Sequence, residues 1–279
     1  MINSTNGTES ITVIEPKSGW QVLNLKELTE YKDLFIFLVW RNIKVVYAQT
    51  ILGFSWALLE PMIQILLFTI IFGKVAQIET NGIPYFLFST VAIVPWSYMS
   101  QAMTQSSDSL VGSQNLLTKI YFSRLLFPLT PAVSKLLDFS ISMSIVLCVM
   151  LYYRVIPTWN LIFFPFLVVY MIGIVVGFGM WASAMAIRFR DVKLAMPFFI
   201  RMFMYSAPIV YSASSIPERF HLYYSLNPLV GVIEGYRACV LGLPMPWPML
   251  GIGICTMVIL LVSGAFYFRK MERVFVDVV

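Results

Sequence analysis

Six long apolar stretches occupy most of this sequence of 279 residues, and they limit what the chain can fold into. They cover residues 54–72, 84–103, 127–152, 161–187, 196–211 and 249–268. Five of them reach or approach the roughly 20 residues with which an α-helix crosses a hydrocarbon core. The stretch 196–211 is short and holds Pro197, Arg201 and Pro208, and irregular backbone at membrane depth is tolerated only inside protein or beside water. The pattern predicts an all-α integral membrane protein with six transmembrane helices that moves something across the membrane.

Composition agrees with a membrane protein. Hydrophobic residues make up 59% and charged residues 12% of the chain, and the mean hydropathy of +0.80 is too high for a soluble domain. Six packed helices need most of this length, which predicts a single membrane domain. We expect a disordered cytoplasmic tail in 1–24, an amphipathic cytoplasmic interface helix in 25–50, and the six-span domain in 51–279.

The placement of positive charge predicts the orientation in the membrane. Most Lys and Arg residues fall in the N-terminal tail, in 104–126, in 188–195 and after residue 268. The opposite connections hold only Lys74, Arg154, Arg219 and Arg237. Because positive loops stay in the cytoplasm, both termini are predicted to be cytoplasmic, and the net charge of +5 needs no nucleic-acid partner.

Two kinds of site are missing from the sequence. The three cysteines are scattered and His221 is the single histidine, so no metal-ligand spacing exists and we expect no metal or cofactor bound to this chain. No Gly-x-x-x-x-Gly-Lys-[Ser/Thr] loop for the phosphates of ATP occurs either. Energy for transport is therefore expected from another chain or from an ion gradient.

The segment 25–47 repeats apolar residues at three- and four-residue spacing, with charged residues such as Arg41 and Lys44 largely between them. This pattern is typical of an amphipathic helix lying in the cytoplasmic membrane interface. A soluble helix packed on the bundle is the alternative, and both place the segment on the cytoplasmic side.

Charged residues inside the apolar stretches mark three candidate sites, because such residues are costly in a membrane. Glu60, before Pro61, is either a polar contact near a cytoplasmic gate or a hydrated interfacial side chain. Lys135 and Asp138 are spaced to pair on one helix face, which favours a structural ion pair over a substrate contact. Arg201 has no neighbouring carboxylate in the sequence, so it either faces a wet pathway or pairs across helices.

The connection 212–247 is long and not uniformly polar. Asn227 can cap a helix that begins at Pro228, and Glu234 and Arg237 are spaced to pair within it. This helix is too short and too polar to span, so the region predicts re-entrant helices before the last transmembrane helix.

Aromatic residues make up 15% of the chain, and many gather towards its outer side. Aromatic rings stack on the C–H faces of sugars without requiring one linkage, which suits a sliding polymer. The alternative is the aromatic belt that membrane proteins carry at the interface. The residues chosen as candidate channel lining are Phe86, Phe88, Trp96 and Tyr205.

The order and spacing of several short motifs resemble the membrane-spanning subunit of bacterial ABC exporters for polysaccharides, in the O-antigen, capsule and teichoic acid group. The resemblance covers nearly everything from Leu25 onwards, although Ser123 stands where that family often has proline and Arg201 where an uncharged polar residue is expected. The motifs are Tyr31-Lys32-Asp33-Leu34, Trp40-Arg41-Asn42-Ile43-Lys44, Tyr47-Ala48-Gln49-Thr50, Leu52-Gly53, Trp56, Glu60-Pro61, Leu117-Thr118-Lys119-Ile120-Tyr121-Phe122-Ser123-Arg124, Arg188-Phe189-Arg190-Asp191-Val192, Asn227-Pro228 and Glu234-Gly235-Tyr236-Arg237.

The resemblance implies a permease subunit in the bacterial inner membrane that forms a homodimer with one central channel. Two copies of a separate ATPase, which uses ATP and Mg, would dock on its cytoplasmic face. The cargo would be a lipid-linked polysaccharide moved outwards from the cytoplasmic side. We expect a coupling helix in 116–124 that contacts the ATPase through Lys119, Ile120, Tyr121, Phe122 and Arg124.

Two other classes of function stay open at this point. An ion-gradient-driven secondary transporter would need ionisable residues near the middle of the membrane, usually in repeated halves, and no repeat is visible. A membrane-embedded glycolipid-processing enzyme would need convergent acid, base or metal groups, which one histidine and scattered carboxylates do not offer. An ATPase gene beside this one would decide among the three classes.

Overall fold

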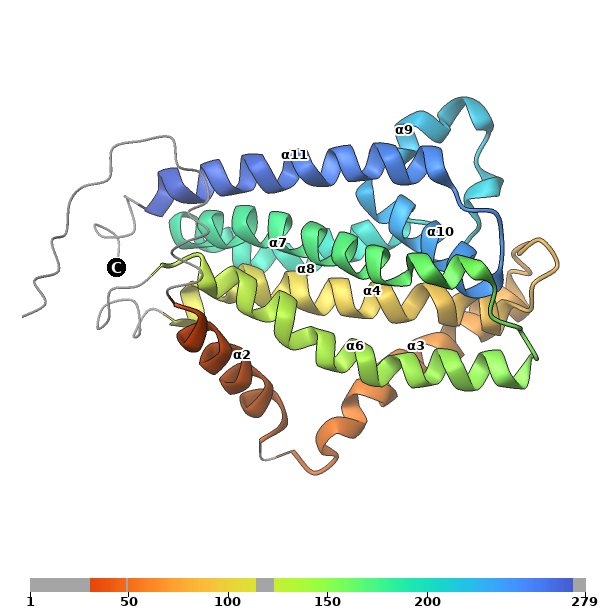
Figure 1. Cartoon of the computed structure of the whole chain (residues 1–279), viewed down its shortest axis with the longest axis horizontal. Helices are drawn as coiled ribbons and strands as arrows, with labels where there is room; N and C mark the ends of the chain where they lie inside the picture. Colours follow the sequence, from red (N-terminus) through yellow and green to blue (C-terminus); the bar gives the residue numbers. More distant parts are fainter. Residues whose placement is uncertain (1–30, 49, 114–122, 273–279) are drawn as a thin grey trace, which may run out of the picture.

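The chain forms a bundle of long helices in the computed structural model, which describes residues 31–48, 50–113 and 123–272 (Figure 1). No strand occurs in these ranges, which confirms the all-α prediction. The helices are α2 (Lys32–Tyr47), α3 (Trp56–Phe68, continued by a π-helical segment Thr69–Val75), α4 (Tyr85–Asp108), α6 (Leu126–Tyr152), α7 (Phe164–Arg188), α8 (Arg190–Ser206), α9 (His221–Ser225), α10 (Pro228–Leu241) and α11 (Trp247–Glu272).

Each of the six apolar stretches contains most of one long helix, and the stretch 196–211 leaves its helix after Ser206. In the part of the chain that the structure describes, four segments are long and apolar enough to cross a membrane: Gly53–Val75, Leu126–Tyr152, Trp159–Arg188 and Trp247–Glu272. These are α3, α6, α7 and α11 with their short extensions. The two remaining long helices, α4 and α8, carry more polar residues, and this difference bears on function below.

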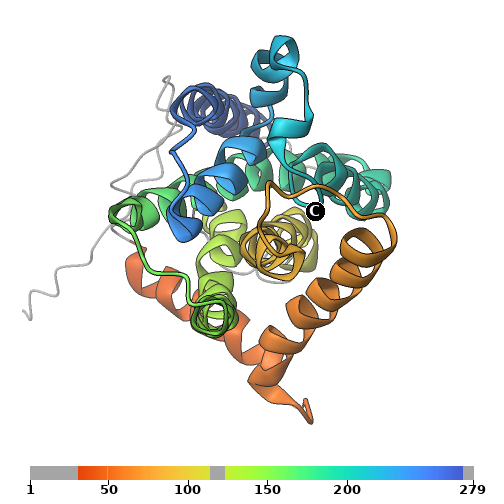
Figure 2. The same cartoon turned by 90° about the vertical axis from the view of Figure 1, so that its right-hand side faces the viewer.

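Helix α4 lies in the middle of the bundle, where α3, α6, α7, α8 and α10 all pack against it (Figure 2). Every residue from Leu87 to Met99 is buried. The main apolar core forms around this helix, with Met99 and Met171 among its members, and a smaller core near the start of α6 includes Leu38 and Phe268.

The long helices run alternately up and down. Helices α4, α7 and α11 end, and α6 and α8 begin, at the end of the bundle where α2 also begins (Figure 1). Helices α7 and α11 pack closely through glycine: a Cβ atom on Gly264 would meet the carbonyl oxygen of Gly177 at 2.8 Å. That seam therefore has no room for a larger residue at Gly264.

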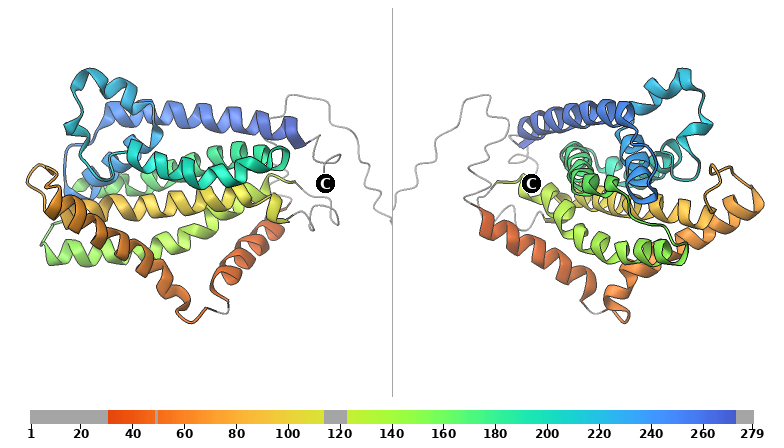
Figure 3. Two further views of the ribbon diagram at one scale, coloured as in Figure 1. Left: turned by 180° about the vertical axis from the view of Figure 1, so that it is seen from behind. Right: turned by 45° about the vertical axis from the view of Figure 1, so that its right-hand side comes forward.

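Helices α2 and α3 form a V whose open side faces the bundle (Figure 1 and Figure 3). The connection at the tip of the V contains Gly53, whose φ of +50° favours a residue without a side chain. The described part of the expected interface helix is thus α2, whereas 1–30 lies outside the described residues.

One part of the predicted organisation is wrong. The stretch 188–195, which its charge assigns to the cytoplasmic loops, is mostly helical, because only Phe189 separates α7 from α8. Its extended backbone, with φ −126° and ψ 107°, turns the chain within a single residue. The apolar stretch 196–211 is a regular helix through Pro197 and breaks only after Ser206. The next residue, Ala207, is extended because it precedes Pro208, and proline disfavours helical backbone at the residue before it.

The connection between α8 and α11 folds as expected at its centre. The Asn227 side chain accepts a hydrogen bond of 3.1 Å from the backbone N–H of Leu229, and Pro228 occupies the first position of α10. Gly242, with φ +71°, ends the helix. The predicted cap and proline start of α10 are confirmed.

Candidate functional site

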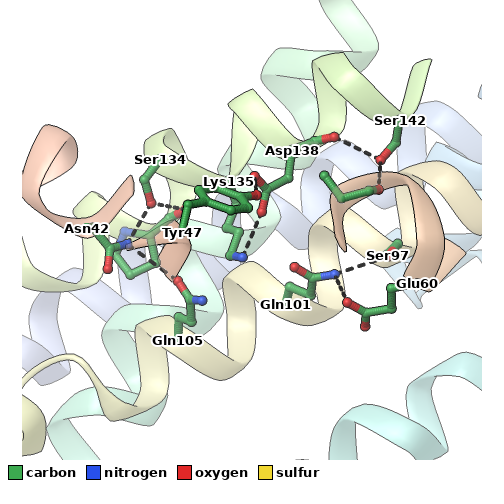
Figure 4. Close-up of polar contacts among 12 residues, drawn as sticks. Asn42, Tyr47, Glu60, Ser97, Gln101, Gln105, Ser134, Lys135, Asp138 and Ser142 are labelled. Atoms are coloured by element: carbon green, nitrogen blue, oxygen red, sulfur yellow. Dashed lines mark hydrogen bonds and ion pairs between the residues drawn. The ribbon is translucent and has the colours of Figure 1, made fainter. Parts of the chain in front are cut away.

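A stripe of polar side chains runs along one face of α4. Its members recur at three- and four-residue spacing, which places them on the same side of the helix: Ser97, Ser100, Gln101, Thr104 and Gln105. Ser97 is buried and the other four are half-buried. Ser97, Gln101 and Gln105 of this stripe take part, with residues of α3, α6 and α2, in the polar contacts drawn in Figure 4.

Glu60 of α3 reaches this stripe. Gln101 Nε2 donates a hydrogen bond of 2.9 Å to Glu60 Oε2 and a second, of 3.4 Å, to Ser97 Oγ (Figure 4). Glu60 remains exposed, whereas the next residue, Pro61, is buried. Glu60 thus combines a polar contact with an exposed side chain, and both interpretations of this residue stay open.

Lys135 and Asp138 of α6 form the predicted ion pair, with 2.7 Å between Lys135 Nζ and Asp138 Oδ2. Both residues are buried, so each charge depends on the other for solvation. The Tyr47 hydroxyl, at the end of α2, donates a hydrogen bond to Asp138 Oδ1. The pKa of the Tyr47 phenol is raised, mainly by burial and next by this hydrogen bond. The group therefore keeps its proton and remains a donor.

Further hydrogen bonds tie the V of α2 and α3 to α6 and α4. Asn42 Nδ2 donates to Ser134 Oγ at 2.7 Å and to Gln105 Oε1 at 3.4 Å. Ser142 Oγ donates to the carbonyl oxygen of Ala57 at 2.7 Å. None of these contacts was foreseen, because each joins residues far apart in the sequence.

Helix α8 carries a second set of polar residues. Arg201 and Tyr205 are both exposed and lie one turn apart on the outward face of this helix. Within the described ranges no carboxylate forms an ion pair with Arg201. On the side facing α3, the sulfur of Met204 accepts a hydrogen bond of 3.5 Å from Gln64 Nε2.

The aromatic candidates separate into two groups. Phe88 and Trp96 lie inside the chain's own core, with 2% and 3% of their surface exposed. Phe86 is partly buried, whereas Tyr205 is exposed on α8. The structure therefore does not bring these four rings together on one surface.

Phe88 instead supports a buried arginine. The Arg237 guanidinium lies 3.6 Å from the centre of the Phe88 ring, and its NH1 pairs with Glu234 Oε1 at 2.8 Å, as predicted. Its NH2 also donates to the carbonyl oxygen of Ile209 at 3.1 Å, and Glu234 Oε1 accepts from the backbone N–H of Ala213 at 3.1 Å. The pair thus clamps the segment that follows α8.

The expected coupling residues fall mostly outside the described residues, since 114–122 contains Lys119, Ile120, Tyr121 and Phe122. Arg124 is described, and its NH1 donates to the carbonyl oxygen of Glu272 at 3.3 Å, next to the end of α11. Arg41 and Lys44 are exposed on α2.

Across the described ranges, no group of three or more His, Cys, Asp or Glu is placed to hold a metal ion.

Comparison with known proteins identifies relatives over most of the chain. A family model described as "ABC-2 type transporter" matches residues 33–241. The O-antigen export system permease protein RfbA of Myxococcus xanthus is 26% identical over 253 residues, which cover 89% of this chain and 96% of that protein. RfbA of Klebsiella pneumoniae is 24% identical, over 88% of this chain and 95% of its own length. The polysialic acid transport protein KpsM of Escherichia coli is 22% identical, over 72% and 78% respectively.

Proposed function

The chain belongs to the ABC-2 type transporter family, and on that premise we propose that it is the permease subunit of an ATP-driven exporter of a lipid-linked, O-antigen-like polysaccharide. The cargo would cross the bacterial inner membrane outwards from the cytoplasmic side. The names of the relatives, which describe O-antigen export and polysialic acid transport, support the class of cargo.

The observation that carries this proposal is the position of the two polar helices. Helices α4 and α8 pack against each other, whereas the four strongly apolar segments belong to α3, α6, α7 and α11. Polar and charged groups at membrane depth are costly unless they face a bundle interior or a water-filled cavity. If α4 and α8 are spans as well, giving six, their polar faces are the natural lining of a pathway. Helix α2 then lies in the cytoplasmic interface, and α9 and α10 are re-entrant on the outer side.

A second copy of the chain is the partner that best explains the exposed faces of α3 and α8. Both faces are apolar enough to meet lipid: the exposed residues are Met62, Ile63, Leu66, Leu67, Ile70 and Ile71 on α3, and Leu194, Phe198, Phe199 and Met202 on α8. Each helix also exposes a charged side chain, Glu60 and Arg201 respectively. Because a charge facing lipid tails is unfavourable, a homodimer that encloses both residues around a shared pathway is favoured over a monomer surrounded by lipid.

A lipid-linked polysaccharide presents three chemistries to such a pathway. Its lipid chain can remain beside the apolar faces of the bundle. Its phosphate can pair with Arg201, or with Arg41 and Lys44 at the cytoplasmic surface, through charge-assisted hydrogen bonds. Its sugars can stack on exposed rings such as Tyr205. Phe88 and Trp96 are buried within the chain, so they would serve the pathway only after a rearrangement.

Energy would come from two copies of a separate ATPase subunit that uses ATP and Mg. We place their docking site at the end of the bundle where α2 begins, on the predicted coupling helix 116–124 and beside α2. This arrangement puts both termini in the cytoplasm, as the charge distribution predicts. A secondary transporter and a glycolipid-processing enzyme are not favoured, because the family is that of ABC transporters.

Gene deletion tests the proposal in the native cell. Cells without the gene should lose surface polysaccharide and accumulate lipid-linked polymer inside, and a plasmid copy should restore export. Affinity purification of the tagged chain should recover an ATPase with a phosphate-binding loop. Normal surface polysaccharide with no internal polymer in the deletion strain would reject the role.

A further inference from the structure

We propose that Glu60 and Gln101 form a subsite that accepts hydrogen bonds from the hydroxyl groups of the cargo's sugars. This inference rests on the proposed function, because it needs a glycan in the pathway. It adds which part of the cargo binds there: the sugar hydroxyls and not the lipid phosphate.

The hydrogen-bond inventory of the pair defines what it can bind. Both N–H groups of the Gln101 amide are used, one on Glu60 Oε2 and one on Ser97 Oγ. The amide nitrogen must face Glu60, because turning the amide would set its oxygen against a carboxylate. No described residue donates to Glu60 Oε1 or to Gln101 Oε1. The pair therefore offers open acceptors and no open donor.

Open acceptors select ligands that donate. Sugar hydroxyls are donors. A hydrogen bond from a hydroxyl to an ionised carboxylate is stronger than one between two neutral groups. A phosphate has only acceptor oxygens and negative charge at neutral pH, so Glu60 repels it. The nearby Lys135 does not reverse this preference, since its ammonium is already paired with Asp138 at 2.7 Å. The phosphate is better met by Arg201 on α8.

The residues next to the pair extend the same chemistry along α4. The Ser100 hydroxyl donates to the carbonyl oxygen of Ser97 at 3.1 Å, and the Thr104 hydroxyl donates to that of Ser100 at 2.7 Å. With their protons used inside the helix, both oxygens are left as acceptors as well. Successive acceptors about one helical turn, or roughly 5.4 Å, apart would let a polymer exchange hydroxyl contacts step by step as it slides.

The location of the pair fits passage of a polymer. One turn after Glu60 on the same face of α3, Gln64 contacts Met204 of α8, so α3 and α8 meet there. Glu60 itself is exposed and Gln101 is half-buried. The carboxylate therefore lies just before the point where the two helices close together, still within reach of a ligand.

Photo-crosslinking in exporting cells tests the subsite directly. A photoreactive benzoylphenylalanine replaces Thr104, next to the pair, and in a control strain it replaces Ser144, which is exposed on α6 and bonds only to its own helix. Irradiation should attach polysaccharide to the chain at 104 and not at 144, read as a ladder with antiserum against the polymer. No polysaccharide adduct at 104, equal adducts at both positions, or an adduct with bare lipid carrier alone would overturn the subsite.

A carboxylate–amide exchange separates binding from structure. Glu60→Gln should lower both the export rate and the polysaccharide adduct at 104 several-fold at equal membrane abundance. The double variant Glu60→Gln/Gln101→Glu returns one carboxylate and one amide to the same pair, and should recover most of both signals. The matched control is Glu79→Gln, at an exposed position beyond α3. Wild-type export and adduct in the Glu60→Gln single variant would also overturn the subsite.

The two proposals can fail separately. If wild-type cells export polysaccharide but the adduct is missing, the subsite is wrong and the proposed function stands. If deletion of the gene leaves surface polysaccharide unchanged, the proposed function itself fails.

Discussion

The hydroxyl of Tyr47, the last residue of α2, donates a hydrogen bond to the buried carboxylate of Asp138 in α6. Asp138 also holds the Lys135 ammonium, so one carboxylate organises a cation from its own helix and a donor from another. Because Ser142, one turn further along α6, binds the backbone of α3, the tip of the V is fixed to α6 from both sides. Movement of α2 is thus expected to reach α3 and α6 together.

Removal of the Tyr47 hydroxyl should loosen this junction. A hydrogen bond to a charged group contributes about 1.5–3 kcal/mol. Tyr47→Phe should therefore lower the thermal midpoint in detergent and weaken the stimulation of the partner ATPase by cargo. Tyr152→Phe, exposed at the far end of α6, is the matched control and should change neither. Unchanged stability and coupling in Tyr47→Phe would show that the contact is dispensable.

The Lys135–Asp138 pair should follow the energetics of buried ion pairs. Lys135→Met leaves the Asp138 carboxylate buried without its counter-ion, which costs about 3–5 kcal/mol. The double variant Lys135→Met/Asp138→Leu removes both charges and should regain most of that loss. Unfolding of the purified chain in a denaturant series measures the difference. A double variant as unstable as Lys135→Met would contradict this account.

Arg237 should control the order of the segment after α8. Arg237→Met removes the bonds to Ile209 and Glu234 and leaves that carboxylate without its partner. Hydrogen exchange in 207–216 should rise, whereas exchange in the middle of α4 should stay slow. Arg237→Lys should restore protection only partly, since an ammonium cannot reproduce the planar, forked geometry of a guanidinium over Phe88. Equal protection of 207–216 from hydrogen exchange in the wild type and in Arg237→Met would show that Arg237 does not order this segment.

Arg201 should serve the pathway through its charge. At equal membrane abundance, Arg201→Ala should impair export more than Arg201→Lys, because lysine keeps the positive charge for a phosphate but loses the bidentate geometry. Export is measured as surface polysaccharide per cell after induction. Lys193→Ala, exposed near the start of the same helix, controls for general loss of charge. Normal export by Arg201→Ala would leave Arg201 as a tolerated, water-facing residue.

Charge reversal in the predicted coupling helix should separate ATP hydrolysis from transport. Lys119→Glu/Arg124→Glu should reduce cargo-stimulated ATPase activity in the assembled complex while the chain still inserts in the membrane. Arg124 also donates to the carbonyl oxygen of Glu272, so Lys119→Glu alone is the cleaner test of docking. Full coupling in both variants would remove this loop from the interface.

The sequence predicts interactions between neighbours on one helix better than contacts between helices. The ion pairs Lys135–Asp138 and Glu234–Arg237 and the Asn227 cap were all predicted, because three- or two-residue spacing determines them. The partners of Asn42 and Tyr47 were not, since they lie on α6 and α4 and depend on how α2 folds back. The sequence also does not show whether an aromatic residue lines a channel or packs in a core. For that reason Phe88 and Trp96 were indistinguishable from Tyr205 before the structure.

Because Phe189 is the single residue between α7 and α8, the end of α7 and the start of α8 cannot move apart. Helix α7 packs closely on α11 through its glycines, so the start of α8 is anchored to this closely packed pair of helices. Any tilt of α8 must then be largest at its far end, where Ala207 and Pro208 break the helix. That end is followed at once by the backbone that Arg237 grips. Helix α8 would thus pivot at Phe189, and the contacts of Arg237 would hold the segment at its far end in place.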